Sequence, residues 1–131
     1  MSQEGKPDTA PGQPVQTVAG VVEADPAEVW DALLATIGPE LSSAGSVFRA
    51  DSERRVLTIS GHWWFRGEYA VSSYEPGSMI VYSMFNVAPA FTRWLVPLVA
   101  RRALRTSARP MIGRQLHAIA SPLGVRGYLT S

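Results

Sequence analysis

Apolar positions along the chain change their period more than once, and each change marks a different secondary-structure element. Residues 15–22 are rich in valine and partly alternate, which is typical of a β-strand. Asp25 and Pro26 then form a pair suited to cap and open a helix. The apolar residues that follow recur at spacings of three and four, which predicts one amphipathic helix: Val29, Trp30, Leu33, Leu34 and Ile37. Gly38 and Pro39 are expected to end it, with at most one further turn over 40–44.

From residue 46 onward the apolar positions alternate, and this period of two predicts a series of antiparallel strands. We expect these strands at 46–50, 55–60, 63–74 and 79–87. Residues 55–74 could be two strands or one long bent strand, because Gly61 and Gly67 can mark a turn, a bulge or a bend. The Glu-Pro-Gly-Ser segment at 75–78 predicts a type II turn with proline and glycine at its centre.

Residues 88–120 are predicted to be helical, but one helical face changes from apolar to basic along this segment. Three apolar residues share an arc with four arginines that lie one or two turns later: Phe91, Trp94, Leu98, Arg101, Arg102, Arg105 and Arg109. Pro97 and Pro110 would kink or break such a helix. The segment can therefore be two or three pieces that dock normally, with solvated arginines. Alternatively, the apolar residues line a cavity and the arginines lie at its mouth or on an anionic surface.

The order of strand, helix, several strands and C-terminal helix predicts an α+β fold. An antiparallel sheet of about four to six strands needs a cover over its apolar face. The long, kinked C-terminal helix is the only predicted element long enough to supply that cover. Residues 1–14 hold three prolines and two glycines with almost no apolar side chains, which predicts a flexible tail. We therefore expect one domain over 15–121 and a short C-terminal tail over 122–131.

Composition narrows the class of protein further. The chain has 131 residues, 46% hydrophobic and 18% charged, which suits one folded domain and is too apolar for a disordered protein. It has no cysteine, so disulfides, thiolate metal sites and a cysteine nucleophile are excluded. No signal peptide is recognisable, and the longest apolar stretch, 95–100, is far too short to span a membrane. The expected location is the cytoplasm.

The net charge of +1 conceals a strong asymmetry. All acidic residues lie in 1–75, whereas 76–131 carries seven arginines and no acid. Such a split indicates an anionic ligand, a membrane surface, a partner, or pairing between the two halves of the chain. Because the basic part is chiefly the covering helix, we favour pairing within the molecule. The arginines lack the interleaved aromatic residues on strands that nucleic-acid sites use, so no nucleic-acid partner is expected.

The sequence Val-Val-Glu-Ala-Asp-Pro-Ala-Glu-Val-Trp-Asp-Ala-Leu-Leu at 21–34 resembles the opening of the START-like superfamily, also called SRPBCC. That superfamily includes polyketide cyclases and dehydrases and lipid-transfer domains. The order of elements over about 15–120 is similar as well. The resemblance implies a helix-grip fold, in which a curved sheet and the C-terminal helix enclose a hydrophobic pocket. It implies no shared catalytic residue. Fewer strands are predicted here than members of the superfamily usually have, so the chain resembles a shortened member.

The densest group of candidate binding residues lies at 62–69. Neighbouring strand residues point to opposite faces, so Trp63 and Phe65 share a side with the apolar residues of the preceding strand. Trp64 lies on the other side, together with His62 and Arg66. Two adjacent tryptophans cannot both belong to the core of a one-sided sheet. One of them therefore lines a groove, meets a partner such as a dimer mate, or lies under another element.

Four polar residues on the strands have two interpretations each. Arg66 and Glu68 share a face, so they form either a cross-strand ion pair or polar groups at the mouth of a pocket. Tyr82 and Asn86 share a face of the last strand with Ile80 and Met84. If that face is inward, they are polar groups in an apolar cavity, as small-molecule sites require. If it is outward, they are surface residues.

Chemistry beyond binding has little support. His62 is the candidate for acid–base catalysis because histidine titrates near neutral pH, although a lone histidine on a strand is more often structural. There is no glycine-rich phosphate loop, no cluster with metal-ligand spacing and no nucleophile elbow. We therefore expect no metal and no cofactor.

Three functions follow. The favoured one is binding of a hydrophobic or aromatic small molecule, lipid- or polyketide-like, in a cavity between the sheet and the C-terminal helix. Its candidate residues are Trp63, Trp64, Phe65, Arg66, Glu68, Tyr82, Asn86 and Trp94. The second is a polyketide cyclase or dehydratase in which His62 is the catalytic residue. The third is an interaction module that contacts an anionic membrane or a protein through Arg101, Arg102, Arg105 and Arg109. A homodimer is compatible with all three.

Overall fold

The computed structural model describes residues 14–43, 47–61, 65–86 and 107–130, and these form an α+β fold. Six strands make one antiparallel sheet in the order β2-β3-β4-β5-β1-β6, accompanied by two helices. In chain order the elements are β1 (Gln16–Val22), α1 (Pro26–Ser43), β2 (Val47–Asp51), β3 (Val56–Gly61), β4 (Phe65–Tyr74), β5 (Gly77–Asn86), α4 (Arg109–Leu123) and β6 (Gly127–Leu129). The predicted α+β class is confirmed, and the segment over 55–74 is two strands. The predicted N-terminal tail lies almost wholly outside the described ranges.

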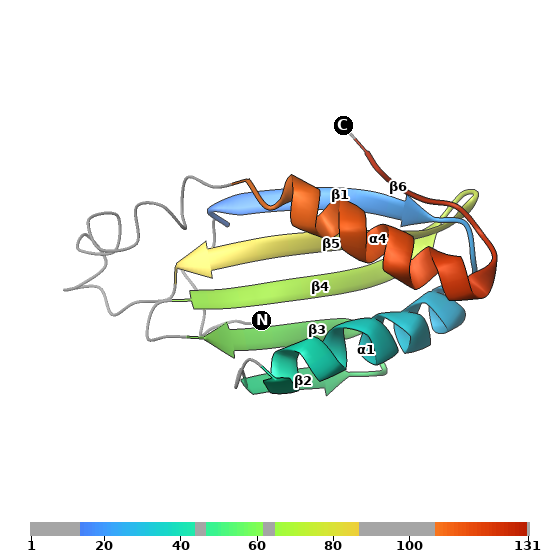
Figure 1. The fold of residues 1–131 in the computed structure, drawn as a ribbon. Coiled ribbons are helices and arrows are strands. Elements are labelled where there is room, and N and C mark those ends of the chain that lie inside the picture. The colour runs from blue at the N-terminus through green and yellow to red at the C-terminus, as the bar shows by residue number, and fades with distance from the viewer. Residues whose placement is uncertain (1–13, 44–46, 62–64, 87–106, 131) are drawn as a thin grey trace, which may run out of the picture.

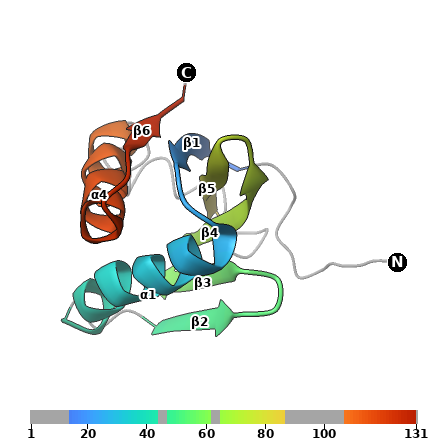
Figure 2. The ribbon, with the colours of Figure 1, turned by 90° about the vertical axis from the view of Figure 1, so that its right-hand side faces the viewer.

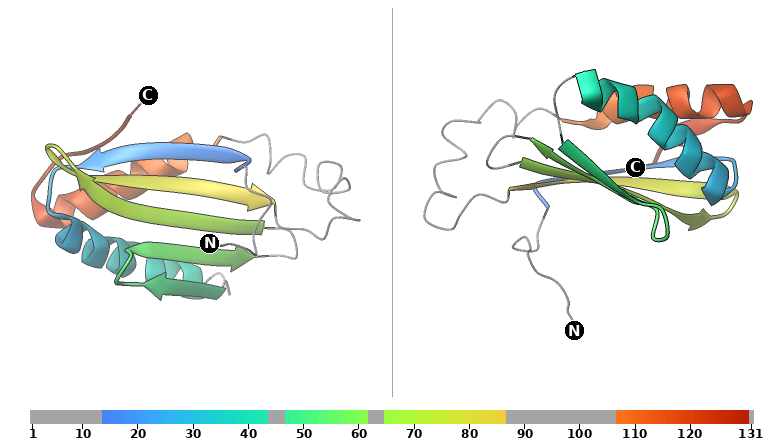
Figure 3. Two further views of the ribbon diagram at one scale, coloured as in Figure 1. Left: turned by 180° about the vertical axis from the view of Figure 1, so that it is seen from behind. Right: turned by 90° about the horizontal axis from the view of Figure 1, so that it is seen from below.

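Both helices lie on one face of the sheet, which we call the inner face (Figure 1). The two helices stand on the same side of the strands when the sheet is viewed end-on (Figure 2). The opposite, outer face carries no described helix (Figure 3). The C-terminal helix therefore covers the sheet as predicted, but it shares that role with α1. Neither of the described helices is long and apolar enough to cross a membrane.

The hydrophobic core lies between the inner face and the two helices. The apolar stripe predicted for α1 is buried there apart from Leu34, which is half-buried, and α4 contributes four buried side chains: Ile112, Leu116, Ile119 and Ala120. The sheet supplies alternate residues of its strands, as the period of two requires: Val18, Val22, Leu57, Ile59, Tyr69, Val71, Ile80, Tyr82 and Met84. Removal of this apolar surface from water is the dominant favourable contribution to folding.

α1 continues to Ser43, so the predicted end at Gly38 and Pro39 is wrong. A proline inside a helix removes one backbone hydrogen bond and crowds the preceding turn. Pro39 is exposed, so its ring does not disturb the core. Ile37 on one side of it is buried, and Glu40 on the other side lines a hollow beside α4. Burial of the turn before the proline thus outweighs the local helix-breaking signal.

The β4–β5 hairpin is tighter than the sequence indicated. Tyr74 pairs with Gly77, so the loop consists of Glu75 and Pro76 alone, and the predicted type II turn with Pro76 and Gly77 at its centre is wrong. The peptide bond between Glu75 and Pro76 is cis. A Cβ atom at Gly77 would lie 2.5 Å from the carbonyl oxygen of Val22, so the glycine permits a close backbone approach to the β1–α1 connection.

The C-terminal part contains a strand that the sequence did not indicate. α4 ends at Leu123, and Gly124 reverses the chain with a left-handed backbone (φ 69°). The chain then returns as β6, which pairs antiparallel with β1. Residues 122–131, expected as a tail, therefore contribute the end of α4 and an edge strand of the sheet. The part of the predicted helix over 88–106 lies outside the described residues.

Candidate functional site

The candidate residues from the sequence do not form one site. Seven of them lie outside the described part of the chain: His62, Trp63, Trp64, Trp94, Arg101, Arg102 and Arg105. The other six are placed by the structure in three locations. The inner face carries Phe65, Tyr82 and Asn86, the outer face carries Arg66 and Glu68, and α4 begins with Arg109.

The inner face of β4 and β5 carries an aromatic cluster formed by Phe65, Tyr69 and Tyr82. Tyr69 and Tyr82 are register partners across the two strands, with ring centroids 4.9 Å apart and ring planes 50° apart. Both are buried, whereas Phe65 is half-buried. A Cβ atom at Gly67 would lie 3.1 Å from the Phe65 ring and 3.3 Å from the Tyr82 ring. The glycine thus makes room for both rings over β4.

A hydrogen bond joins the aromatic cluster to α4. The hydroxyl of Tyr69 donates to Oε1 of Gln115 over 2.8 Å. Gln115 also lines a hollow of about 290 Å³ between the two helices, together with Thr36, Glu40, Met111, Arg114 and Ala118. Gln115 therefore links the polar surface between α1 and α4 to the buried aromatic rings.

Burial raises the pKa of both tyrosines in the cluster above the value near 10 of an exposed tyrosine. For Tyr69, the hydrogen bond to Gln115 opposes this rise in pKa, whereas nearby Tyr82 and Glu40 add to it. Both phenols are therefore protonated at neutral pH. The proton of the Tyr69 hydroxyl is donated to Gln115, so Tyr82 is the phenol left to donate a hydrogen bond to a ligand. Neither phenol supplies a phenolate base at neutral pH.

This burial predicts an alkaline loss of stability. In the unfolded chain Tyr69 and Tyr82 release their protons near pH 10, whereas the native protein retains them. The native state then binds more protons, so the free energy of unfolding should fall as pH rises above 10. Urea titrations across that range, with phenolate absorbance recorded in parallel, measure both quantities. The Tyr69→Phe/Tyr82→Phe double variant should show a flatter pH dependence. Ionisation of all four tyrosines with the native structure intact would contradict the prediction.

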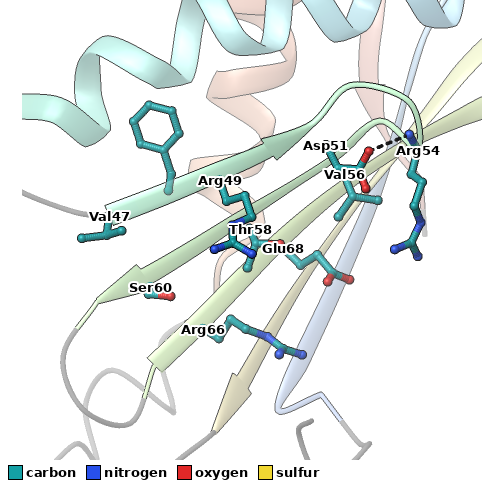
Figure 4. Close-up of a pocket in the computed structure, with 10 residues that line it drawn as sticks. Val47, Arg49, Asp51, Arg54, Val56, Thr58, Ser60, Arg66 and Glu68 are labelled. Atoms are coloured by element: carbon teal, nitrogen blue, oxygen red, sulfur yellow. Dashed lines mark hydrogen bonds between the residues drawn. The ribbon is translucent and has the colours of Figure 1, made fainter. Parts of the chain in front are cut away.

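The outer face carries a groove of about 540 Å³ over β2, β3 and β4 (Figure 4). Arg66 and Glu68 line it, and so do residues that sequence reasoning did not single out, among them Arg49, Asp51 and Thr58. Apart from Val47, Phe48 and Val56, its lining is polar and carries both signs of charge. A groove of this composition is poorly suited to a hydrophobic ligand.

Arg66 packs on an aromatic ring in this groove. Its guanidinium carbon is 4.8 Å from the ring centroid of Phe85, its register partner on β5. Its Nε is buried and has no hydrogen-bond partner among the described residues. Glu68 lies between Thr58 and Ser83 in the register of the strands. No ion pair joins Arg66 or Glu68 to another described residue, so the cross-strand ion pair is not seen within the described ranges.

One described ion pair joins the basic C-terminal half to the acidic half of the chain. The exposed Arg109 contacts its own half, since its Nη1 donates to the carbonyl oxygen of Thr130 over 3.2 Å. Arg126 lies 3.9 Å from a carboxylate oxygen of Glu23. The Arg126 side chain is 76% exposed, so this ion pair contributes little to stability. Pairing between the basic and acidic halves is therefore present but weak in the described part of the chain.

Sequence reasoning missed Tyr69 and Gln115. Tyr69 could have been found, because the alternation that places Phe65 inward also places Tyr69 inward. Gln115 could not, because its contact depends on how α4 is rotated over the sheet. Among the residues that the structure describes, no three His, Cys, Asp or Glu side chains come together in a way that could hold a metal ion.

No protein-family model matches the chain, and no curated protein shows significant sequence similarity to it.

Proposed function

We propose that this protein binds a hydrophobic or aromatic small molecule, lipid- or polyketide-like, between the inner face of its sheet and α4. The observation that carries the proposal is the aromatic cluster of Phe65, Tyr69 and Tyr82, joined to α4 through Gln115. Small-molecule sites are mostly apolar and hold a few polar groups that fix the orientation of the ligand. Two protonated phenols and an amide among aromatic and aliphatic side chains fit that composition.

The end of the sheet nearest Phe65 is the better place for a ligand. Phe65 and Asn86 are register partners there, and both are half-buried. At the other end of β5, Ile80 is fully buried under the helices. The apolar surface of the inner face is thus less completely covered beside Phe65 than beside Ile80. Tyr82 lies on the same face, two strand positions from Met84. A ligand would lie over this end with a phenol in reach.

A shortened helix-grip fold of the START-like kind is part of this proposal. The order of β1, α1, four antiparallel strands and α4 across the inner face supports it. β6 is an addition to that order, because it follows the helix and extends the sheet beside β1. In such a fold the space between the C-terminal helix and the sheet is where a ligand would bind.

Gly67→Val is expected to lower the affinity for such ligands by about tenfold or more, because the new methyl groups would enter the space beside Phe65 and Tyr82. Native mass spectrometry and fluorescence titration with a panel of long-chain fatty acids and polycyclic aromatic compounds measure the affinity. Ala70→Val is the matched control, since it adds bulk to the outer face of the same strand. Absence of binding across the panel, or equal affinity in the two variants, would refute the proposal.

The enzyme and interaction alternatives stay predictions. The enzyme hypothesis rests on His62, which lies outside the described residues. The interaction hypothesis rests on four arginines, and three of these also lie outside the described residues. At the aromatic cluster itself, Tyr69 and Tyr82 hold their protons at neutral pH, so Tyr82 can supply a hydrogen-bond donor but neither phenol supplies a base. Binding is therefore better supported there than acid–base chemistry.

A further inference from the structure

β2 forms one end of the sheet, and no described strand pairs with its outer edge. Four of its five residues are exposed, with Val47 71% and Phe48 38% accessible. The N–H and C=O groups on the outer edge of an end strand can pair with another chain. β2 therefore offers hydrogen-bonding groups and apolar side chains to a partner at the same place.

The other end of the sheet is different. β6 has only three residues, all half-buried, and Arg109 donates to the carbonyl oxygen of Thr130 beside it. Short edge strands and contacts of this kind discourage pairing with another chain. β2 has neither feature: it is paired with β3 without a bulge from Val47 to Asp51, and it contains no proline or lysine. Only the β2 edge is thus open to strand addition within the described sheet.

The charges of β2 are complementary to those of a second copy of this chain. Arg49 and Asp51 lie on the same face of the strand, two positions apart. When two identical strands pair antiparallel about a two-fold axis, residues on the same face meet and one residue meets itself. A centre at Arg49 or at Asp51 would place like charges opposite each other, which is destabilising. A centre at Ala50 places Arg49 opposite Asp51 twice.

We propose that two copies of the protein pair through β2 in antiparallel fashion, with Ala50 at the two-fold axis and Arg49 opposite Asp51 of the second copy. The two sheets then form one continuous sheet, with all the helices on the same side. Within β2 this register pairs only three residues of each copy, so the dimer is expected to be weak and concentration-dependent. The inference does not depend on the proposed ligand.

Charge exchange tests the register. Arg49→Glu places a second carboxylate opposite Asp51, and Asp51→Lys places an ammonium group opposite Arg49, so each variant alone should dimerise about tenfold more weakly than the wild type. An equimolar mixture of the two variants allows a heterodimer in which the carboxylate of one copy faces the ammonium group of the other. That mixture should therefore dimerise better than either variant alone.

Sedimentation velocity of the full chain at concentrations up to about 0.5 mM, a range suited to small interfaces, measures the dimerisation of the wild type, the two variants and their mixture. Arg114→Glu, the same charge change on α4, is the control and should leave dimerisation unchanged.

A wild type that stays monomeric throughout, or a mixture no better than its components, would overturn the proposal. Asp51→Lys also removes the carboxylate that accepts the N–H of Arg54 at 3.1 Å, so its circular dichroism spectrum must match that of the wild type. If the Asp51→Lys variant does not fold, the dimerisation of Arg49→Ala is compared with that of Arg49→Glu in place of the mixing experiment. The glutamate variant must then weaken the dimer more than the alanine variant, and equal effects would refute the Arg49–Asp51 pairing.

Discussion

Leu116→Ala is expected to lower the free energy of unfolding by about 3 kcal/mol, which lies within the range for a buried leucine. Leu116 is 1% exposed and belongs to the stripe that docks α4 on the sheet. A Cβ atom at Gly20 of β1 would overlap Cδ1 of Leu116, so the leucine rests directly on the backbone of β1. Truncation would leave a cavity between the helix and the sheet. Urea unfolding measures the loss.

Two variants make this test specific. His117→Ala, one position along on the exposed side of α4, should change the stability by less than about 0.5 kcal/mol. Gly20→Ala alone should be destabilising, because its methyl group overlaps Leu116. Combined with Leu116→Ala, that methyl group occupies part of the cavity, so the double variant should lose less than the sum of the single losses. Additive losses would show that α4 does not pack on β1 in this way.

Gly77→Ala is expected to destabilise the protein by about 2–3 kcal/mol through steric overlap. The added Cβ would lie 2.5 Å from the carbonyl oxygen of Val22, 2.6 Å from the nitrogen of Ala24 and 2.7 Å from Cα of Glu23. All three are backbone atoms, so no side chain can move aside. The hairpin would have to move away from the β1–α1 connection. Thermal and urea unfolding measure the change in stability.

Gly113→Ala is the matched control for this substitution. Gly113 lies inside α4, and a Cβ there would meet only the Leu129 side chain, at an ordinary contact distance of 3.4 Å. Alanine is the better helix former, so this variant should gain about 0.5–1 kcal/mol. Opposite signs for the two Gly→Ala substitutions are therefore expected. A neutral Gly77→Ala would contradict the close approach that the structure shows.

The parts of the fold that the sequence predicted correctly are those with a local period. The stripe of Leu33 and its neighbours marks a helix packed on one side, and the alternation around Leu57 and Ile80 marks half-buried strands. β6 was not predicted because three residues are too few to show an alternation of apolar and polar positions. Its pairing with β1 also depends on residues about a hundred positions away. The continuation of α1 through Pro39 was missed for the same reason, since contacts with α4 override a local signal.

The candidate binding residues could be predicted only as far as their strands could be followed. Alternation correctly divided Phe65 from Arg66, but it could not decide which face of β5 is inward, because both faces carry apolar residues. The structure places Tyr82 inward and Phe85 under Arg66. Gln115 required the rotation of α4, and the outer groove required β2 to lie beside β3 with Arg49 facing Thr58. The rotation of a helix over a sheet and the pairing of two strands cannot be predicted from the pattern of residues in a short window of sequence.

The position of β1 has a consequence for the order in which the sheet can be completed. β1 is the first of the described strands, yet it lies between β5 and β6, and Ala19 accepts hydrogen bonds from Thr130 across 111 positions of sequence. During synthesis β1 leaves the ribosome before the other described strands and has none of its partners in the sheet until β5 appears. Its second edge stays open until the segment after α4 has left the ribosome. Closing such long loops slows folding, so among the described strands β1 waits longest for its full set of neighbours.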